Sequence, residues 1–230
     1  QRAAHLQAEI SIIVPLYNTP TKLFDEMLQS VVRQTYTNWE LVLVDASDAT
    51  SGWSAVCPRL CPARLCMSRL KTAALPQHDP RICAGARRVH HAAGPRRCAL
   101  PNALFEVVQT IQNTGADFVY SDEIVLSADL KKLGGYHFKP DFAPDYLRGV
   151  NFITHLAVFS RPLLDAAGAY ESKKFDGAQD HDLILRLTEK AQRIEHIKKV
   201  LYIWRAAAGS TAAGMEAKPY AVAAGERAID

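Results

Sequence analysis

The chain has 230 residues, of which 48% are hydrophobic and 22% charged, and its formal net charge is +3. These values are ordinary for one soluble globular domain that spans residues 1–230. The charge is too small to indicate nucleic-acid binding, and no apolar run is long enough to cross a bilayer. Residues 1–10 do not read as a secretory signal, so we expect a cytoplasmic protein, free or at the inner face of the membrane.

A strand, a helix and a second strand open the chain. Residues 9–17 (EISIIVPLY) are a short, β-branched apolar run, which predicts a buried strand. Apolar residues then recur at helical spacing from Leu23 to Val32. Residues 39–45 (WELVLVD) predict a second buried strand. This order predicts two parallel strands joined by a right-handed crossover.

The carboxyl ends of these two strands predict a binding edge, because ligands of open parallel sheets bind there. This edge is expected to hold Pro15, Tyr17, Asn18, Asp45 and Asp48. A carboxylate in this place can accept hydrogen bonds from a nucleobase or a ribose. The alternative is a generic doubly wound domain in which Asp45 is merely solvated.

Residues 51–99 differ in composition from the rest of the chain. They hold nine of the 27 basic residues, one of the 24 acidic residues and all five cysteines. Such a change marks a domain boundary, a linker or an error in the sequence. The cysteine spacing is not that of a paired zinc framework. The basic stretch 59–97 contains no aromatic residue, and Trp53 is the only one in residues 51–99, so stacking recognition of RNA is not expected.

Regular patterns return after residue 100. Helices are predicted at 101–114, just after Pro162 and at 180–191, and strands at 117–120, 155–160 and 194–204. The class is α/β with a mostly parallel central sheet flanked by helices.

An acid-rich segment, residues 175–182 (FDGAQDHD), precedes the helix at 180–191. A carboxylate at a helix N-terminus is stabilised in its ionised form and can act as a general base. The alternative is that Asp180 and Asp182 are only first-turn acids of that helix.

Taken in order, these motifs resemble family-two glycosyltransferases with the A-type fold. The resemblance covers residues 9–50 and 100–225, and it rests on SIIVPLYN, VRQTY, WELVLVDASD, YSDE, FKPD, FDGAQDHD and YIWR. It implies that a nucleoside-diphosphate sugar binds across the two strand ends and that Asp180 is the catalytic base. It also implies that Asp122, Glu123, Asp182 and Trp204 line the site.

The same resemblance implies an inverting sugar transfer in surface polysaccharide synthesis, such as that of O-antigen or capsule. The expected partners are the donor and a glycan or lipid-linked acceptor, with peripheral membrane contact and no nucleic acid. The oligomeric state does not follow from the sequence.

Family members carry an acidic motif that binds Mg²⁺ or Mn²⁺, and it should fall near residues 94–99. This chain has Arg96 and Arg97 there, and arginine cannot ligate a cation, so no metal ligands are predicted in the chain as it stands. For one permitted choice of codons, a one-base shift of residues 87–100 reads Ala-Gly-Tyr-Ile-Thr-Leu-Leu-Asp-His-Asp-Asp-Ala-Leu. This is a buried strand that ends in the expected motif.

We therefore hypothesise that residues 51–99 are partly or wholly translated out of frame. The alternatives are an inactive or damaged glycosyltransferase relative without its metal site, and a module that binds an anionic polymer through residues 59–97.

Overall fold

The computed structural model describes residues 8–45, 47, 65–69, 88–91, 97–168 and 178–206. Its strands are β1 (Ile10–Leu16), β2 (Trp39–Asp45), β3 (Leu65–Arg69), β4 (Arg88–His91), β5 (Arg97–Ala99), β6 (Phe118–Leu126), β7 (Leu133–His137), β8 (Ala157–Ser160) and β9 (Ile194–Arg205). Its helices are α1 (Thr21–Val32), α2 (Ala103–Thr114), α3 (Pro144–Gly149), α4 (Arg161–Ala167) and α5 (Gln179–Lys190).

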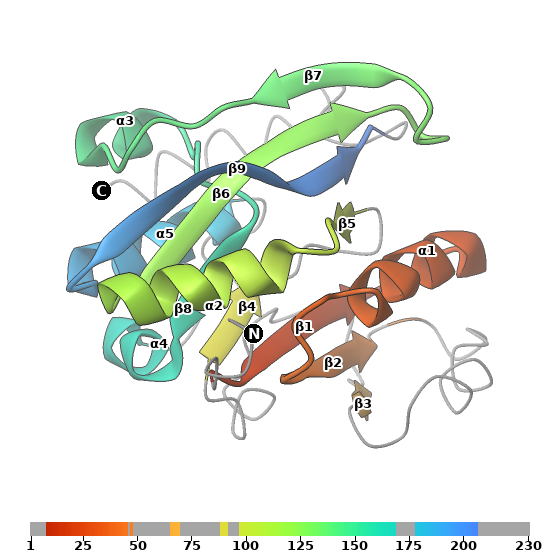
Figure 1. The fold of residues 1–230 in the computed structure, drawn as a ribbon, viewed down its shortest axis with the longest axis horizontal. Coiled ribbons are helices and arrows are strands. Elements are labelled where there is room, and N and C mark those ends of the chain that lie inside the picture. Colours follow the sequence, from red (N-terminus) through yellow and green to blue (C-terminus); the bar gives the residue numbers. More distant parts are fainter. Residues whose placement is uncertain are drawn as a thin grey trace.

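The described strands form one sheet in the order β3-β2-β1-β4-β8-β6-β9-β5, with β7 paired to β6 (Figure 1). β1 and β2 are parallel over their whole length, from Ile10 opposite Trp39 to Leu16 opposite Asp45. This confirms the predicted strand, helix and strand. The sheet is more mixed than the sequence indicated, because β8 runs antiparallel to both β4 and β6.

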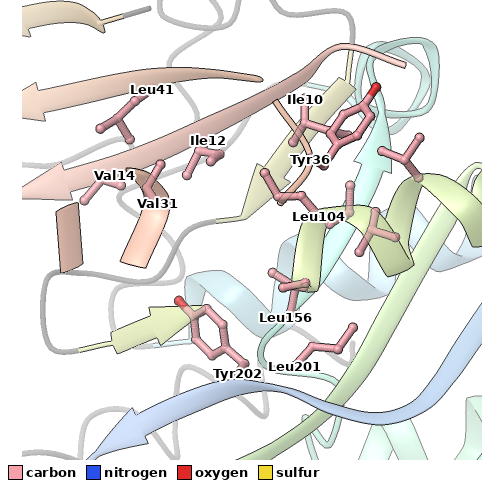
Figure 2. Packing of buried hydrophobic residues seen from close by; sticks show 14 of the residues in the cluster. Ile10, Ile12, Val14, Val31, Tyr36, Leu41, Leu104, Leu156, Leu201 and Tyr202 are labelled. Atoms are coloured by element: carbon pink, nitrogen blue, oxygen red, sulfur yellow. The ribbon is translucent and has the colours of Figure 1, made fainter. Parts of the chain in front are cut away.

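Each face of the sheet carries its own apolar core, because successive side chains of a buried strand point to opposite faces. On one face, α1 and α2 pack against β1; Figure 2 shows Val14 of β1 with Val31 of α1, and Leu104 of α2 in the same cluster. On the other face, Ile13 belongs to a cluster with Leu183 of α5. Figure 1 shows α2 in front of the sheet and α5 behind it.

Five elements were not predicted, namely β3, β4, β5, β7 and α3, and one strand is longer than predicted. The strand expected at 117–120 continues as β6 to Leu126, because β7 and β9 pair with its second half. β7 contains two glycines and α3 has only six residues, so neither carries a readable apolar period. Asp122 and Glu123, which were expected to line the site just after a strand, therefore lie inside β6.

Within the described ranges, no helix has both the length and the apolar character that a bilayer crossing needs.

Candidate functional site

A chain of hydrogen bonds joins the carboxyl ends of β1 and β2. The backbone N–H of Asn18 donates to Ser47 Oγ over 2.8 Å, and the backbone N–H of Ser47 donates to Asp45 Oδ1 over 2.9 Å. The two loops are thus fixed to each other around the Asp45 carboxylate. A polar edge that is held in place before a ligand arrives loses little conformational entropy on binding.

The predicted binding residues take different positions along this edge. Pro15 is buried inside β1 and Asp45 is buried at the end of β2. Tyr17 and Asn18 are exposed, and Asn18 has a positive φ of 43°. Asp48 lies outside the described residues. The structure therefore brings together four of the five predicted residues, two of them open to solvent.

Helix α5 carries the predicted catalytic residue in its first turn. Asp180 is half-buried, and no side chain caps the N-terminus of the helix. The backbone N–H groups of a first turn and the helix dipole both favour a negative charge at this place. The site therefore suits a carboxylate that stays ionised until it takes a proton.

Asp182 has a structural role in the same helix. Its buried carboxylate forms an ion pair with Arg186 over 2.7 Å. Arg186 also donates to the carbonyl oxygens of Ala167 and Gly168, over 2.9 and 3.1 Å. Asp182 therefore holds α5 against the end of α4.

A contact between α3 and α5 fixes the surroundings of Asp180. Nε2 of the buried His181 donates to the carbonyl oxygen of Leu147 over 2.6 Å. Leu147 is itself buried in the same apolar cluster as Leu183. This hydrogen bond joins α3 to the first turn of α5.

The two acids of β6 have separate partners. Asp122 accepts from the backbone N–H of Lys139 over 2.9 Å and lies 2.9 Å from His196 Nε2. Oε1 of Glu123 accepts from Thr154 Oγ1 over 3.0 Å and lies 3.1 Å from His137 Nδ1.

Glu123 is fully buried, and its second carboxylate oxygen has no hydrogen-bond partner among the described atoms. The two contacts of its neighbour Asp122 are both made through Oδ1. The two acids, predicted as one motif, thus have different partners.

A pair of stacked rings lies beside the Asp122 carboxylate. The ring of Tyr120 stacks on that of His196, with centroids 4.7 Å apart. Burial raises the pKa of the Tyr120 hydroxyl, and the charges of Asp141 and Asp122 raise it further. This hydroxyl donates to the carbonyl oxygen of Pro140 over 2.6 Å, so it remains a neutral donor at physiological pH.

Trp204 lies where β5 meets β9. It is half-buried, its ring meets that of His137 edge-on, with centroids 6.1 Å apart, and its register partner in β5 is Arg97. Trp204 therefore stands beside the segment in which the acidic motif was expected.

The described residues do not fit a divalent cation. They contain no group of three or more His, Cys, Asp or Glu side chains that could hold one. Strand β5 is Arg-Cys-Ala, and arginine offers no lone pair to a metal. Arg96 and most of the basic stretch 59–97 lie outside the described residues, so the polymer-binding alternative stays a prediction.

Strand β4 has a central position for which its residue types are unsuited. It pairs with β1 through Ile13 opposite His91 and with β8 through Phe159 opposite Val89. Both neighbours are buried, and apolar clusters cover both faces of the sheet here. A strand in such surroundings is normally apolar throughout, but β4 reads Arg-Val-His-His.

Two residues of these groups were missed in the sequence, because Ser47 joins the two strand ends and His196 pairs with Asp122. Lys139 belongs to the predicted FKPD motif; it is buried and donates through Nζ to the carbonyl oxygen of Ile153 over 2.6 Å. Ser47 stands between Asp45 and Asp48 and could have been found as a turn hydroxyl. His196 gives no local signal, because its partner is far away in the chain.

Comparison with known proteins adds three findings. Residues 11–71 match the model of glycosyl transferase family 2. The chain is 39% identical to the uncharacterized protein y4gI of Sinorhizobium fredii and 34% identical to the O-antigen biosynthesis protein RfbC of Myxococcus xanthus, each over 96% of the chain. The chain spans only 25% and 18% of the lengths of these two relatives.

Solved structures share the fold. TarS of S. aureus in complex with UDP-GlcNAc superposes with a TM-score of 0.72 at 18% identity, covering 88% of this chain and 60% of that one. The mannosyltransferase PcManGT of Pyrobaculum calidifontis, in complex with GDP-Man and Mn²⁺, gives 0.60 at 17% identity, with 86% and 57% covered. The predicted A-type fold is confirmed.

Proposed function

Because the chain belongs to glycosyl transferase family 2, we propose that it transfers a sugar from a nucleoside-diphosphate sugar to a glycan or lipid-linked acceptor in surface polysaccharide synthesis. The observation that carries the proposal is the pre-formed edge at the ends of β1 and β2, where Asn18, Ser47 and Asp45 are linked. The structural neighbours bind UDP, UDP-GlcNAc and GDP-Man, which supports a donor of this class.

The donor would lie across the edge, with its nucleoside at Asp45 and the exposed Tyr17 and Asn18 beside it. A buried carboxylate in a partly desolvated place accepts stronger hydrogen bonds than one in water. Ser47 occupies one oxygen of Asp45, which orients the carboxylate. This arrangement supports recognition of a ribose or a base by Asp45.

In the proposed reaction Asp180 acts as the general base of an inverting displacement. The acceptor hydroxyl gives its proton to the Asp180 carboxylate while its oxygen bonds to the anomeric carbon of the donor sugar. The bond from that carbon to the diphosphate oxygen breaks, and its electron pair leaves with the nucleotide. One displacement from the opposite side inverts the anomeric configuration.

A metal would assist departure of the nucleotide in this scheme. A neighbour is bound to Mn²⁺, and a divalent cation neutralises charge on a leaving diphosphate, but the described residues contain no group of ligands for one. We infer that residues 51–99 are at least partly out of frame. The central position of β4 supports this inference, because the shifted reading supplies Gly-Tyr-Ile-Thr at its four codons and two leucines directly after them. The family match extends to residue 71, so the first part of this segment still resembles the family.

The second candidate is an inactive relative, which the arginine in β5 favours if the sequence is correct as given.

A lipid-linked acceptor would bring an active chain into peripheral contact with the inner face of the membrane. Nucleic acid has no part in either function.

Asp180→Asn tests the proposal. We expect sugar transfer to fall by about 10²–10⁴-fold, since general base catalysis typically contributes that much, while donor affinity stays unchanged. UDP-GlcNAc and GDP-mannose serve as donors, and nucleotide release is measured together with binding of UDP and GDP by calorimetry.

Glu189→Gln is the matched control, because Glu189 is an exposed carboxylate at the other end of the same helix. It should leave both readouts unchanged. Full turnover in Asp180→Asn would remove Asp180 from the mechanism, and absence of nucleotide binding in the wild-type chain would argue against the donor site itself.

A further inference from the structure

Helix α3, which is hydrogen-bonded to the first turn of α5, carries an exposed aromatic ring. Tyr146 is 52% exposed, although it is a large side chain with an apolar ring. Its neighbour in sequence, Leu147, accepts the hydrogen bond from His181, which follows Asp180. Tyr146 and Asp180 are thus the sequence neighbours of the two residues that join α3 to α5.

The ring of Tyr146 is held rigidly from behind. It stacks on Phe152, with centroids 5.2 Å apart and an interplanar angle of 17°. Phe152 in turn meets Tyr120 edge-on at 6.1 Å, and Tyr120 stacks on His196. These contacts connect an exposed ring on a short helix with the middle of the sheet.

A backed aromatic ring is well suited to bind a sugar. A pyranose presents a patch of C–H groups on one face, and these pack on an aromatic ring whose face is electron-rich. A ring that is already fixed loses little side-chain entropy when the sugar arrives.

Polar groups for sugar hydroxyls are also at hand. Asp145 and Arg148 flank Tyr146 on α3, and their side chains are 96% and 67% exposed, with 3.6 Å between Asp145 Oδ1 and Arg148 Nη1. An ion pair in water is weak, so these groups can exchange partners with a ligand.

We propose that Tyr146 forms a subsite for a pyranose of the acceptor glycan, with its ring stacked on the sugar and Asp145 and Arg148 bonded to the hydroxyls. The proposal rests on the proposed function, since an acceptor must reach Asp180 to lose its proton. It goes further by naming the surface from which the acceptor approaches, the α3 side of α5.

Binding of simple sugars tests the subsite without catalysis. The probes are the methyl glycosides of glucose, galactose, mannose, rhamnose and N-acetylglucosamine, titrated against the chain by saturation-transfer NMR. At least one should bind saturably in the millimolar range. Tyr146→Ala should weaken that binding by about tenfold, because an aromatic stacking contact contributes about that much.

Two variants keep this test specific. Tyr146→Phe retains the ring and should bind like the wild-type chain. Tyr136→Ala removes a ring of similar exposure, 58%, that is stacked on Phe138 in the β7 hairpin and should have no effect. Equal melting temperatures would show that α3 is intact in every variant.

The subsite is refuted if no glycoside binds saturably or if Tyr146→Ala binds as well as the wild-type chain. Failure of the catalytic proposal looks different, because glycosides would still bind at Tyr146 while no nucleotide is released from either donor. Where transfer is measurable, Tyr146→Ala should raise the KM for the acceptor and leave donor hydrolysis by water unchanged.

Discussion

Strand β1 has β2 on one side and β4 on the other, so these two strands meet nearly the same surroundings. β2 supplies Leu41, Val42, Leu43 and Val44, all buried, and then ends in a carboxylate held by Ser47. β4 supplies Arg-Val-His-His at the equivalent depth of the sheet. The position of a strand can evidently be set by its neighbours even where its own residue types argue against burial.

The two strands also differ in what they offer a ligand. The A-type fold forms with both β2 and β4 in the sheet, but of these two strands only β2 ends in an acidic residue where a ligand would bind. Charged residues in a central strand cost stability wherever they are buried without partners, and an edge without carboxylates offers a divalent cation few of the oxygen ligands it prefers. If β4 and β5 are read out of frame, both deficits have one cause.

The largest effect is expected from repair of the reading frame across residues 87–100. Replacing residues 87–99 with the thirteen residues of the shifted reading should raise the free energy of unfolding by about 5 kcal/mol, since each large apolar side chain contributes about 1.5–3 kcal/mol on burial. Urea denaturation measures this. Nucleotide release should become Mn²⁺-dependent and rise by about a thousandfold, as expected for several kcal/mol of charge stabilisation.

Re-reading the coding DNA comes first, because it decides which chain is the natural one. A scrambled version of the thirteen replaced residues is the control and should gain neither stability nor activity. A repaired chain that is no more stable than the original would mean that β4 tolerates its polar residues, and the comparison with β2 would collapse.

A smaller effect is expected at Asp45, the carboxylate at the end of β2. Asp45→Asn keeps the size of the side chain but removes the charge, so affinity for UDP or GDP should fall by about tenfold, the loss of one charge-assisted hydrogen bond. Calorimetry measures it. Asp165→Asn, at an exposed acid of α4 paired with Arg161, is the control and should bind normally. Unchanged affinity in Asp45→Asn would place the nucleoside elsewhere.

The sequence predicted well those elements whose burial is periodic. β2 has the predicted bounds, and β1 and α5 differ by one residue at each end, because continuous apolar runs and helical spacing are direct consequences of packing. The strand-end acid Asp45 was found for the same reason, since it closes such a run.

Long-range pairing was not predictable. The split between Asp122 and Glu123 depends on two strands from later in the chain: β7 begins to pair at Glu123, and β9 shifts register between these two residues. Tyr146 has no local signal either, because its importance comes from Phe152 behind it and from the contact of His181 with Leu147. Contacts of this kind leave no period in the sequence.

The smallest effect concerns Cys98 of β5, which reports whether that strand packs in the chain as given. Burial raises the pKa of its thiol, and Sγ lies 4.0 Å from the carbonyl oxygen of Glu26 on α1. The nearby Arg205 opposes the shift, but burial is the larger influence. Because the thiolate is the reactive form, alkylation at neutral pH should be slower than that of the same cysteine in an unfolded peptide.

Mass spectrometry of the Cys98 peptide after timed exposure to iodoacetamide measures this rate, and the same peptide in urea is the control. The rate should rise as the pH passes the usual thiol range, since more thiolate then forms. Fast alkylation in native buffer would mean that β5 does not rest on α1 and β9. β5 would then differ from β2 in the packing of its backbone as well as in its residue types.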